Sequence, residues 1–185
     1  MKIKIGIMGS ADDTLPAGGV AVAVREKSEA LGQECAARGL VLLTGATTGL
    51  PEIAGRAAHE AGGLHVGVSP AANEHEHINA YGLPVDACDL IIYTGFGLKG
   101  RNVVLVRSCD IVIVIGGSMG ALNEFTIAHD EGRIIGCLTG TGGVADEAAR
   151  LLQTLPKKTG ASVFHNDDPA RLLAVCMDAL EQWKK

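Results

Sequence analysis

Short runs of apolar residues alternate along the chain with longer segments in which apolar positions recur every three or four residues. The short runs are typical of strands, and several contain only Val, Ile and Leu, which indicates burial on both faces, as in a parallel sheet. Strands are expected at Ile3–Met8, Leu40–Thr44, Leu64–Val68, Leu90–Tyr93, Ile111–Ile115, Ile134–Leu138 and Ser162–Phe164. Helices are expected at Val20–Arg38, Pro51–Ala61, Lys99–Ser108, Ala121–Glu131, Val144–Thr154 and Ala170–Trp183.

The regular alternation of strand and helix predicts right-handed βαβ crossovers. The expected fold class is therefore α/β, with an open, doubly wound and mostly parallel sheet of about six or seven strands flanked by helices. No linker, internal repeat or break in composition divides residues 1–185, so we expect a single domain.

One long segment, Ser69–Ala87, shows no periodic pattern and contains the polar sequence EHEH. A metal site needs three or four converging ligands, and His75 and His77 supply two at most. We therefore expect no metal site and interpret the segment as a solvated loop. The alternative is a lid over a ligand pocket.

Composition and charge narrow the class of protein. The 185 residues are 47% hydrophobic and 3% aromatic, as expected of a compact globular chain. The formal net charge of −5 argues against nucleic-acid binding, which needs a basic surface. The longest apolar run, Ile111–Gly117, is too short to cross a membrane. The five cysteines are odd in number and form no CxxC pair, which is typical of reduced thiols in a cytoplasmic protein.

Glycines cluster where four of the predicted strands end. The loops are Gly9-Ser10, Gly45–Gly49, Gly116–Gly120 and Gly140–Gly143. The carboxyl ends of parallel strands share one edge of a sheet, where glycine lets the backbone approach a ligand and helix N-termini favour anions. We therefore expect a phosphate-bearing small ligand at this edge. The candidate binding residues are Gly9, Ser10, Gly45, Thr47, Thr48, Gly49, Gly116, Gly117, Ser118, Met119, Gly120 and Ala121.

The alternative is a purely structural role, in which these glycines only make tight turns and the hydroxyl side chains among them cap helices. None of the loops matches GxxxxGK[ST], and GxGxxG does not follow the first strand. Neither a P-loop nor the usual dinucleotide site is predicted, and we expect no cofactor.

An arginine and a glutamate flank the strand at Ile111–Ile115. Arg101 lies in the preceding helix and Glu124 in the first turns of the following one, so both can reach the same sheet edge. The arginine can bind phosphate or hold the carboxylate ionised. The glutamate can bind ribose hydroxyls, stabilise an oxocarbenium-like centre or activate water.

The segment GGSMGALNE, with Arg101 ahead of it and the loop Gly45–Leu50 earlier in the chain, resembles the LOG family of Rossmann-like proteins. The family motif Pro-Gly-Gly-x-Gly-Thr-x-x-Glu falls on residues 116–124. The resemblance covers the chain from Gly9 to about Val144. It implies a Rossmann-like fold, a homodimer or higher homo-oligomer, and a nucleotide site. It also implies phosphoribohydrolase activity on nucleoside 5′-monophosphates, with Arg101 and Glu124 as the catalytic pair.

The sequence departs from that motif at several positions. Gly116 stands for the Pro, Ser118 for a Gly, Ala121 for the Thr, and Asn102 for the Lys after the Arg. The chain therefore resembles a divergent branch related in fold to the DNA-uptake protein DprA and to molybdenum-cofactor carriers. The alternative function is a non-catalytic carrier of a phosphate-bearing molecule such as a nucleotide or a pterin cofactor. Single-stranded DNA binding is disfavoured by the acidic charge and the few aromatic residues.

Overall fold

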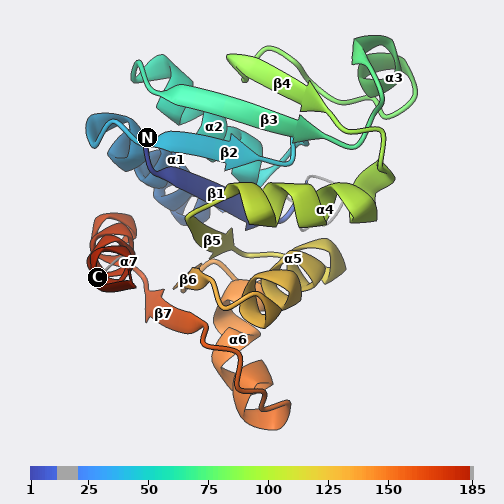
Figure 1. Cartoon of the computed structure of the whole chain (residues 1–185). Coiled ribbons are helices and arrows are strands. Elements are labelled where there is room, and N and C mark those ends of the chain that lie inside the picture. Colours follow the sequence, from blue (N-terminus) through green and yellow to red (C-terminus); the bar gives the residue numbers. More distant parts are fainter. Residues whose placement is uncertain (12–20, 184–185) are drawn as a thin grey trace.

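The computed structural model describes residues 1–11 and 21–183, and its seven strands form one parallel sheet (Figure 1). The predicted doubly wound α/β fold is confirmed. The strands are β1 Lys4–Gly9, β2 Val41–Thr44, β3 Leu64–Ser69, β4 Leu90–Tyr93, β5 Ile111–Ile115, β6 Ile134–Leu138 and β7 Ser162–Asn166. The helices are α1 Val22–Ala37, α2 Leu50–Glu60, α3 Glu74–Asn79, α4 Gly97–Ser108, α5 Met119–Asp130, α6 Gly143–Thr154 and α7 Pro169–Trp183.

The strand order β4-β3-β2-β1-β5-β6-β7 fixes where a ligand can bind. From β1 the chain winds outward through β2, β3 and β4, and then returns to the middle to place β5 on the other side of β1. The helices after β1 and β5 therefore leave the sheet in opposite directions. In open parallel sheets, such a switch point leaves a crevice beyond the carboxyl ends of the two central strands.

Two hydrophobic cores pack against the two faces of the sheet. One joins the sheet to α1, α2 and α7, and is centred on residues such as Ile5, Leu31 and Leu172. The other joins it to α4, α5 and α6 through residues such as Leu105 and Phe125. Strand β5 is buried along its whole length and contributes to both cores, because alternate side chains point to opposite faces. This explains its unbroken Ile/Val sequence.

The segment predicted as an irregular solvated loop, Ser69–Ala87, differs from that expectation. It contains α3, whose N-terminus is capped by the Asn73 side chain accepting a hydrogen bond from the Glu76 N–H. His77 on this helix is fully buried, whereas His75 is exposed. The prediction failed because the short polar sequence gives no helical apolar stripe.

The predicted helix boundaries differ from the observed ones by a few residues. The first helix was expected from Val20, which lies outside the described residues, and the structure begins α1 at Val22. Helices α4 and α5 begin two residues earlier than predicted, at Gly97 and Met119. In both cases glycine at or near the helix start hid the boundary, because glycine is a poor helix former.

The close packing of α1 on α2 depends on Gly32. A Cβ at this position would overlap the carbonyl oxygen of Ala54 on α2. We expect Gly32→Ala to force the helices apart and to lower the free energy of unfolding by about 1–3 kcal/mol, the usual cost of overpacking. Urea denaturation measures this, with Gln33→Ala on the exposed neighbouring position as the control. Equal stability of the two variants would contradict the packing argument.

Candidate functional site

A pocket of about 560 Å³ lies beyond the carboxyl ends of β1, β2 and β5, between the N-terminal turns of α4 and α5. Its volume suits a small phosphate-bearing ligand, since ligand pockets usually span ~300–1,000 Å³. Ten of the residues selected from the sequence line it, namely Gly9, Gly45, Thr47, Thr48, Arg101, Ser118, Met119, Gly120, Ala121 and Glu124. The sequence reasoning missed Tyr81, Leu83, Leu98 and Lys99, which also line it.

Four other selected residues, Ser10, Gly49, Gly116 and Gly117, lie beside the pocket rather than on its wall. The Ser10 hydroxyl accepts a hydrogen bond from the Gly117 N–H at 2.8 Å, which ties the end of β1 to the loop after β5. The Gly116 N–H donates to the Thr141 hydroxyl at 2.8 Å. Gly116 and Gly117 have φ of 58° and 103°, a left-handed backbone that favours glycine. These residues shape the loops that carry the wall.

The glycine loop before α6 already binds a carboxylate of the same chain, that of Asp146. The N–H groups of Gly140 and Gly142 donate to the Asp146 carboxylate at 2.7 and 2.9 Å. This carboxylate in the first turn satisfies the helix dipole from within the chain. The expectation that all four glycine loops serve a ligand phosphate therefore does not hold for Gly140–Gly143, which lies outside the pocket wall.

Helix α2 likewise leaves little room for an anion. Its Leu50 N–H donates to the Ser10 carbonyl at 2.9 Å, Pro51 has no N–H, and Glu52 places a negative charge in the first turn. A carboxylate at that position is itself attracted by the positive end of the helix dipole. The N-terminus of α2 is thus satisfied without a ligand.

The N-terminus of α5 is different. Ser118 is the N-cap residue, yet its side chain makes no capping hydrogen bond, and the first turn holds no acidic residue. Within the described part of the chain, the N–H groups of Met119, Gly120 and Ala121 have no acceptor. The Lys99 ammonium lies close by, 3.8 Å from where a Cβ on Gly120 would be. Free N–H groups, a positive dipole end and a lysine are groups that attract an anion.

Arg101 and Glu124 form an ion pair beneath this site. Arg101 Nη1 lies 3.6 Å from Glu124 Oε1, and the two side chains are 6% and 9% exposed. Gly45 makes the arrangement possible, because a Cβ there would overlap the guanidinium. The Arg101 Nε is buried and has no hydrogen-bond partner among the described residues. A buried guanidinium nitrogen without a partner indicates a place where a ligand oxygen or water completes the site.

Burial raises the pKa of the Glu124 carboxyl to about 7, while the positive charges of Arg101 and Lys99 act in the opposite direction. Burial also lowers the pKa of the Arg101 guanidinium, and Glu124 opposes that shift. A carboxyl group that titrates near neutrality in a pocket is suited to proton transfer.

Asn102 lies against the same carboxylate. In the amide orientation that places its nitrogen toward Glu124, it donates to Oε1 at 3.1 Å and to the Leu98 carbonyl at 2.9 Å. Asn102 stands where the LOG motif has a lysine. The exchange replaces a charged neighbour of Glu124 with a neutral hydrogen-bond donor.

Residues outside the pocket have structural roles. Arg107 forms a 2.6 Å ion pair with Glu131 on the surface. All five cysteines are free, and four of them are buried. Among residues 1–11 and 21–183, no group of three His, Cys, Asp or Glu side chains is placed to hold a metal ion. No helix in the described part of the chain has the length and apolar composition needed to cross a bilayer.

An all-parallel sheet with a glycine-lined pocket at its switch point defines a Rossmann-like α/β protein. The chain belongs to the SLOG cluster4 family, whose model matches residues 2–173. It is 32% identical over 124 residues to an uncharacterised protein of Archaeoglobus fulgidus, covering 67% of this chain and 75% of that protein.

Solved structures share this fold. The structural-genomics target TM1055 is 24% identical and superposes with a TM-score of 0.82, covering 96% of this chain and 99% of its own. The molybdenum cofactor binding protein from Rippkaea orientalis is 26% identical, with a TM-score of 0.76 and coverage of 97% and 98%. DprA from Helicobacter pylori shares the fold at 15% identity, with a TM-score of 0.60 and coverage of 97% and 81%. The predicted kinship with LOG-like proteins is confirmed.

The electrostatic link between the buried pair can be tested directly. We expect Arg101→Met to raise the pKa of Glu124 above its value of about 7, because burial is then opposed by Lys99 alone. A ¹³C NMR titration of the glutamate carboxyl carbons measures the change. Arg107→Met, on the exposed side of the same helix, serves as the control and leaves that pKa unchanged. An unchanged or lower Glu124 pKa in Arg101→Met would show that the pair is not coupled.

Proposed function

We propose that residues 1–185 form one nucleotide-binding domain whose pocket takes a nucleoside 5′-monophosphate. The phosphate lies at the N-terminus of α5, bound by the N–H groups of Met119, Gly120 and Ala121 and by Lys99. The observation that carries this proposal is the uncapped start of α5, next to a buried Arg–Glu pair in the same pocket. Of the three helices that follow the glycine loops at residues 45–49, 116–120 and 140–143, α2 and α6 are already satisfied at their starts, which favours α5 as the place for the phosphate.

The chemistry proposed for this pocket is hydrolysis of the N-glycosidic bond. Water adds to the ribose C1′ as the C1′–N bond breaks, and its proton passes through Glu124 to the departing base. The products are the free base and ribose 5-phosphate. Glu124 in its ionised form also stabilises the positive charge that develops at C1′. Arg101 favours that ionised form and offers its unpartnered Nε to the ligand.

A second candidate function is that of a non-catalytic carrier. It is favoured by one observation: the molybdenum cofactor binding protein from Rippkaea orientalis is similar over 97% of this chain. A pterin phosphate presents the same anion to α5 and a planar ring system to the rest of the pocket. Saturable binding of molybdopterin, with no product from any nucleotide, would favour this function over hydrolysis.

The surface of the outer strands supports a homo-oligomer. Leu64, Leu90 and Ile92 are 41%, 56% and 47% exposed, although they are large apolar side chains. They share the sheet face that carries α4, because Val66 and Val68 beside them belong to the core under that helix. We therefore also propose that a second copy of the chain covers the sheet face formed by Leu64, Leu90 and Ile92. The five free thiols support a cytoplasmic location, where thiols stay reduced.

The hydrolytic proposal predicts a specific loss of activity. We expect the protein to release free base and ribose 5-phosphate from at least one purine 5′-monophosphate, N6-substituted ones included. Glu124→Gln should lower kcat by roughly 10²–10⁴, the usual contribution of a general base. The wild-type kcat/KM should rise with pH through about 7, because the ionised carboxyl is the active form and its pKa is about 7.

Glu131→Gln is the matched control, since Glu131 lies at the far end of α5 and pairs with Arg107 on the surface. The products are quantified by chromatography at several pH values. Turnover by Glu124→Gln equal to that of the wild type would refute the assignment of the general base. A rate that is constant between pH 5 and 9 would refute the role of the ionised carboxyl.

The oligomer can be tested separately. We expect Ile92→Asp to lower the mass of the assembly, because a charge on the proposed interface must be desolvated. Light scattering coupled to size-exclusion chromatography measures that mass. Ile78→Asp, at an exposed position of α3, is the control and should leave it unchanged. A wild-type protein that is monomeric at micromolar concentration would contradict the proposal.

A further inference from the structure

One wall of the pocket is formed by a segment without regular structure. Between the end of α3 at Asn79 and the start of β4 at Leu90, no residue lies in a helix or strand. Tyr81, Gly82 and Leu83 at the beginning of this segment line the pocket. We call these three residues the lip. The N–H groups of Tyr81 and Leu83 donate to the carbonyls of Glu76 and His77, so the lip is attached to α3 and its position depends on what holds α3 and the residues after it.

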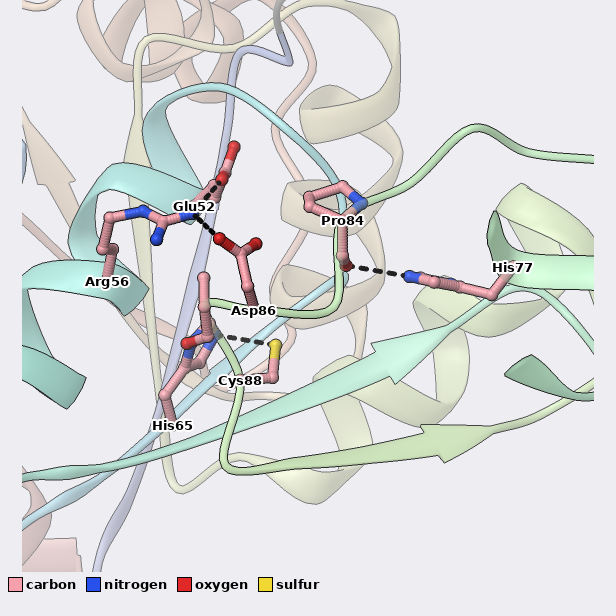
Figure 2. Close-up of polar contacts among 8 residues, drawn as sticks. Glu52, Arg56, His65, His77, Pro84, Asp86 and Cys88 are labelled. Carbon is pink, nitrogen blue, oxygen red and sulfur yellow. Dashed lines mark hydrogen bonds and ion pairs between the residues drawn. The ribbon is translucent and has the colours of Figure 1, made fainter. Parts of the chain in front are cut away.

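His77 supplies two hydrogen bonds to the segment. Its ring nitrogen Nε2 lies 3.0 Å from the Pro84 carbonyl oxygen (Figure 2). Its own backbone carbonyl accepts from the Leu83 N–H at 3.1 Å. The other ring nitrogen, Nδ1, lies 2.8 Å from the Ser69 hydroxyl at the end of β3. A carbonyl can only accept, so Nε2 carries the proton and Nδ1 accepts from Ser69. The ring thus links the sheet to the residues that follow the lip.

The far end of the segment is fastened in a similar way by His65. Its Nδ1 lies 2.5 Å from the Ala87 carbonyl oxygen, and its Nε2 lies 2.9 Å from the Thr44 hydroxyl at the end of β2. Figure 2 shows both histidines, with an ion pair from Arg56 to Asp86 between the two attachment points. Both rings are almost completely buried, at 0% exposure for His77 and 1% for His65. Two strand ends therefore hold one irregular segment through two buried imidazoles.

The side chains of the lip are suited to a planar, weakly polar group. Tyr81 and Leu83 line the pocket together with Leu98 of α4. The Tyr81 hydroxyl lies 4.0 Å from the position of a Cβ on Gly97, so the side chain reaches across to the first residue of α4. Aromatic rings stack on nucleic-acid bases with little dependence on the base. The lip thus offers an apolar wall, whereas the start of α5 offers an anion site.

We infer that His77 is a positioning residue: by fixing the lip, it lets Tyr81 and Leu83 contact the heterocyclic base of the bound nucleotide. This inference rests on the proposed function and adds to it the part of the ligand that the lip recognises. An apolar residue could fill the space of the imidazole, but it would leave the Pro84 carbonyl without its donor. The lip would then lose its link to β3 while the phosphate site at α5 stayed intact.

The test compares two ligands in two variants. AMP carries both base and phosphate, whereas ribose 5-phosphate lacks the base. We expect His77→Phe to weaken AMP binding roughly tenfold, within the range for losing a stacked base, and to leave ribose 5-phosphate binding unchanged. His75→Phe is the control, since His75 has the same side chain on the same helix and is exposed. Isothermal titration calorimetry gives the dissociation constants.

Hydrogen exchange of the Leu83 amide in the ligand-free protein reports on the lip independently of any ligand. We expect this amide to exchange faster in His77→Phe than in His75→Phe or the wild type. Tyr81→Ala is a second variant that leaves His77 in place, and it should weaken AMP binding but not ribose 5-phosphate binding.

Each outcome bears on one claim. Unchanged Leu83 exchange in His77→Phe would overturn the fastening role. Equal weakening of both ligands, or of neither, in Tyr81→Ala would overturn recognition of the base by the lip. If the wild type bound ribose 5-phosphate but gained no affinity from the base of AMP, the lip inference would fail alone. A wild type that bound neither ligand would overturn the proposed function and the inference resting on it.

Discussion

The ion pair between Arg101 and Glu124 is the interaction on which the site depends. Taking two charges out of water is costly, and their attraction compensates only when the geometry is good and other groups complete their hydrogen bonds. Here the pair lies between α4 and α5, with Gly45 leaving room for the guanidinium and Asn102 facing the carboxylate. The Nε of Arg101 still has no partner among the described residues. A buried ion pair that still has an unpartnered donor adds little to the stability of the fold, so binding of a ligand explains its presence better.

The fold limits where a charged ligand can bind. Every helix that starts at the carboxyl edge of the sheet offers a positive dipole end, yet these ends are not equivalent. At α6 the Asp146 carboxylate accepts from the N–H groups of the preceding loop. At α2, Pro51 has no N–H to donate and Glu52 already places a negative charge in the first turn. Only at α5, among these three, do free N–H groups, a nearby lysine and the buried pair lie together. Local capping chemistry therefore leaves the start of α5 as the one best suited to an anion among these three.

Much of this arrangement could be predicted from the sequence. Unbroken apolar runs such as Ile111–Ile115 predict buried parallel strands, and glycines after strands predict the edge where the pocket lies. The pairing of Arg101 with Glu124 follows from their positions on either side of one strand. The occupied start of α6 is also a local feature, because Asp146 lies six and four residues from Gly140 and Gly142, whereas the first turn of α5 holds no acidic residue. The sequence reasoning missed this difference because it considered the glycines and not the acidic residue that follows them.

The sequence EHEH is a case in which local reasoning fails. Its polar residues indicate a solvated segment, and they give no sign that His77 is buried while His75 is exposed. The burial depends on Ser69 and Pro84, which lie eight and seven residues away and meet His77 only after β3 has joined the sheet. Tyr81 and Leu83 could not be selected for the same reason, since an irregular segment has no periodicity from which to read its orientation.

The central claim is that the start of α5 binds the phosphate of the ligand. The most direct measurement is an NMR titration of the uniformly ¹⁵N-labelled protein with ribose 5-phosphate. The account predicts saturable changes that are largest for the amides of Met119, Gly120 and Ala121, because these N–H groups gain an acceptor. Saturable changes centred instead on Gly140 and Gly142, or no saturable change at the start of α5, would contradict it.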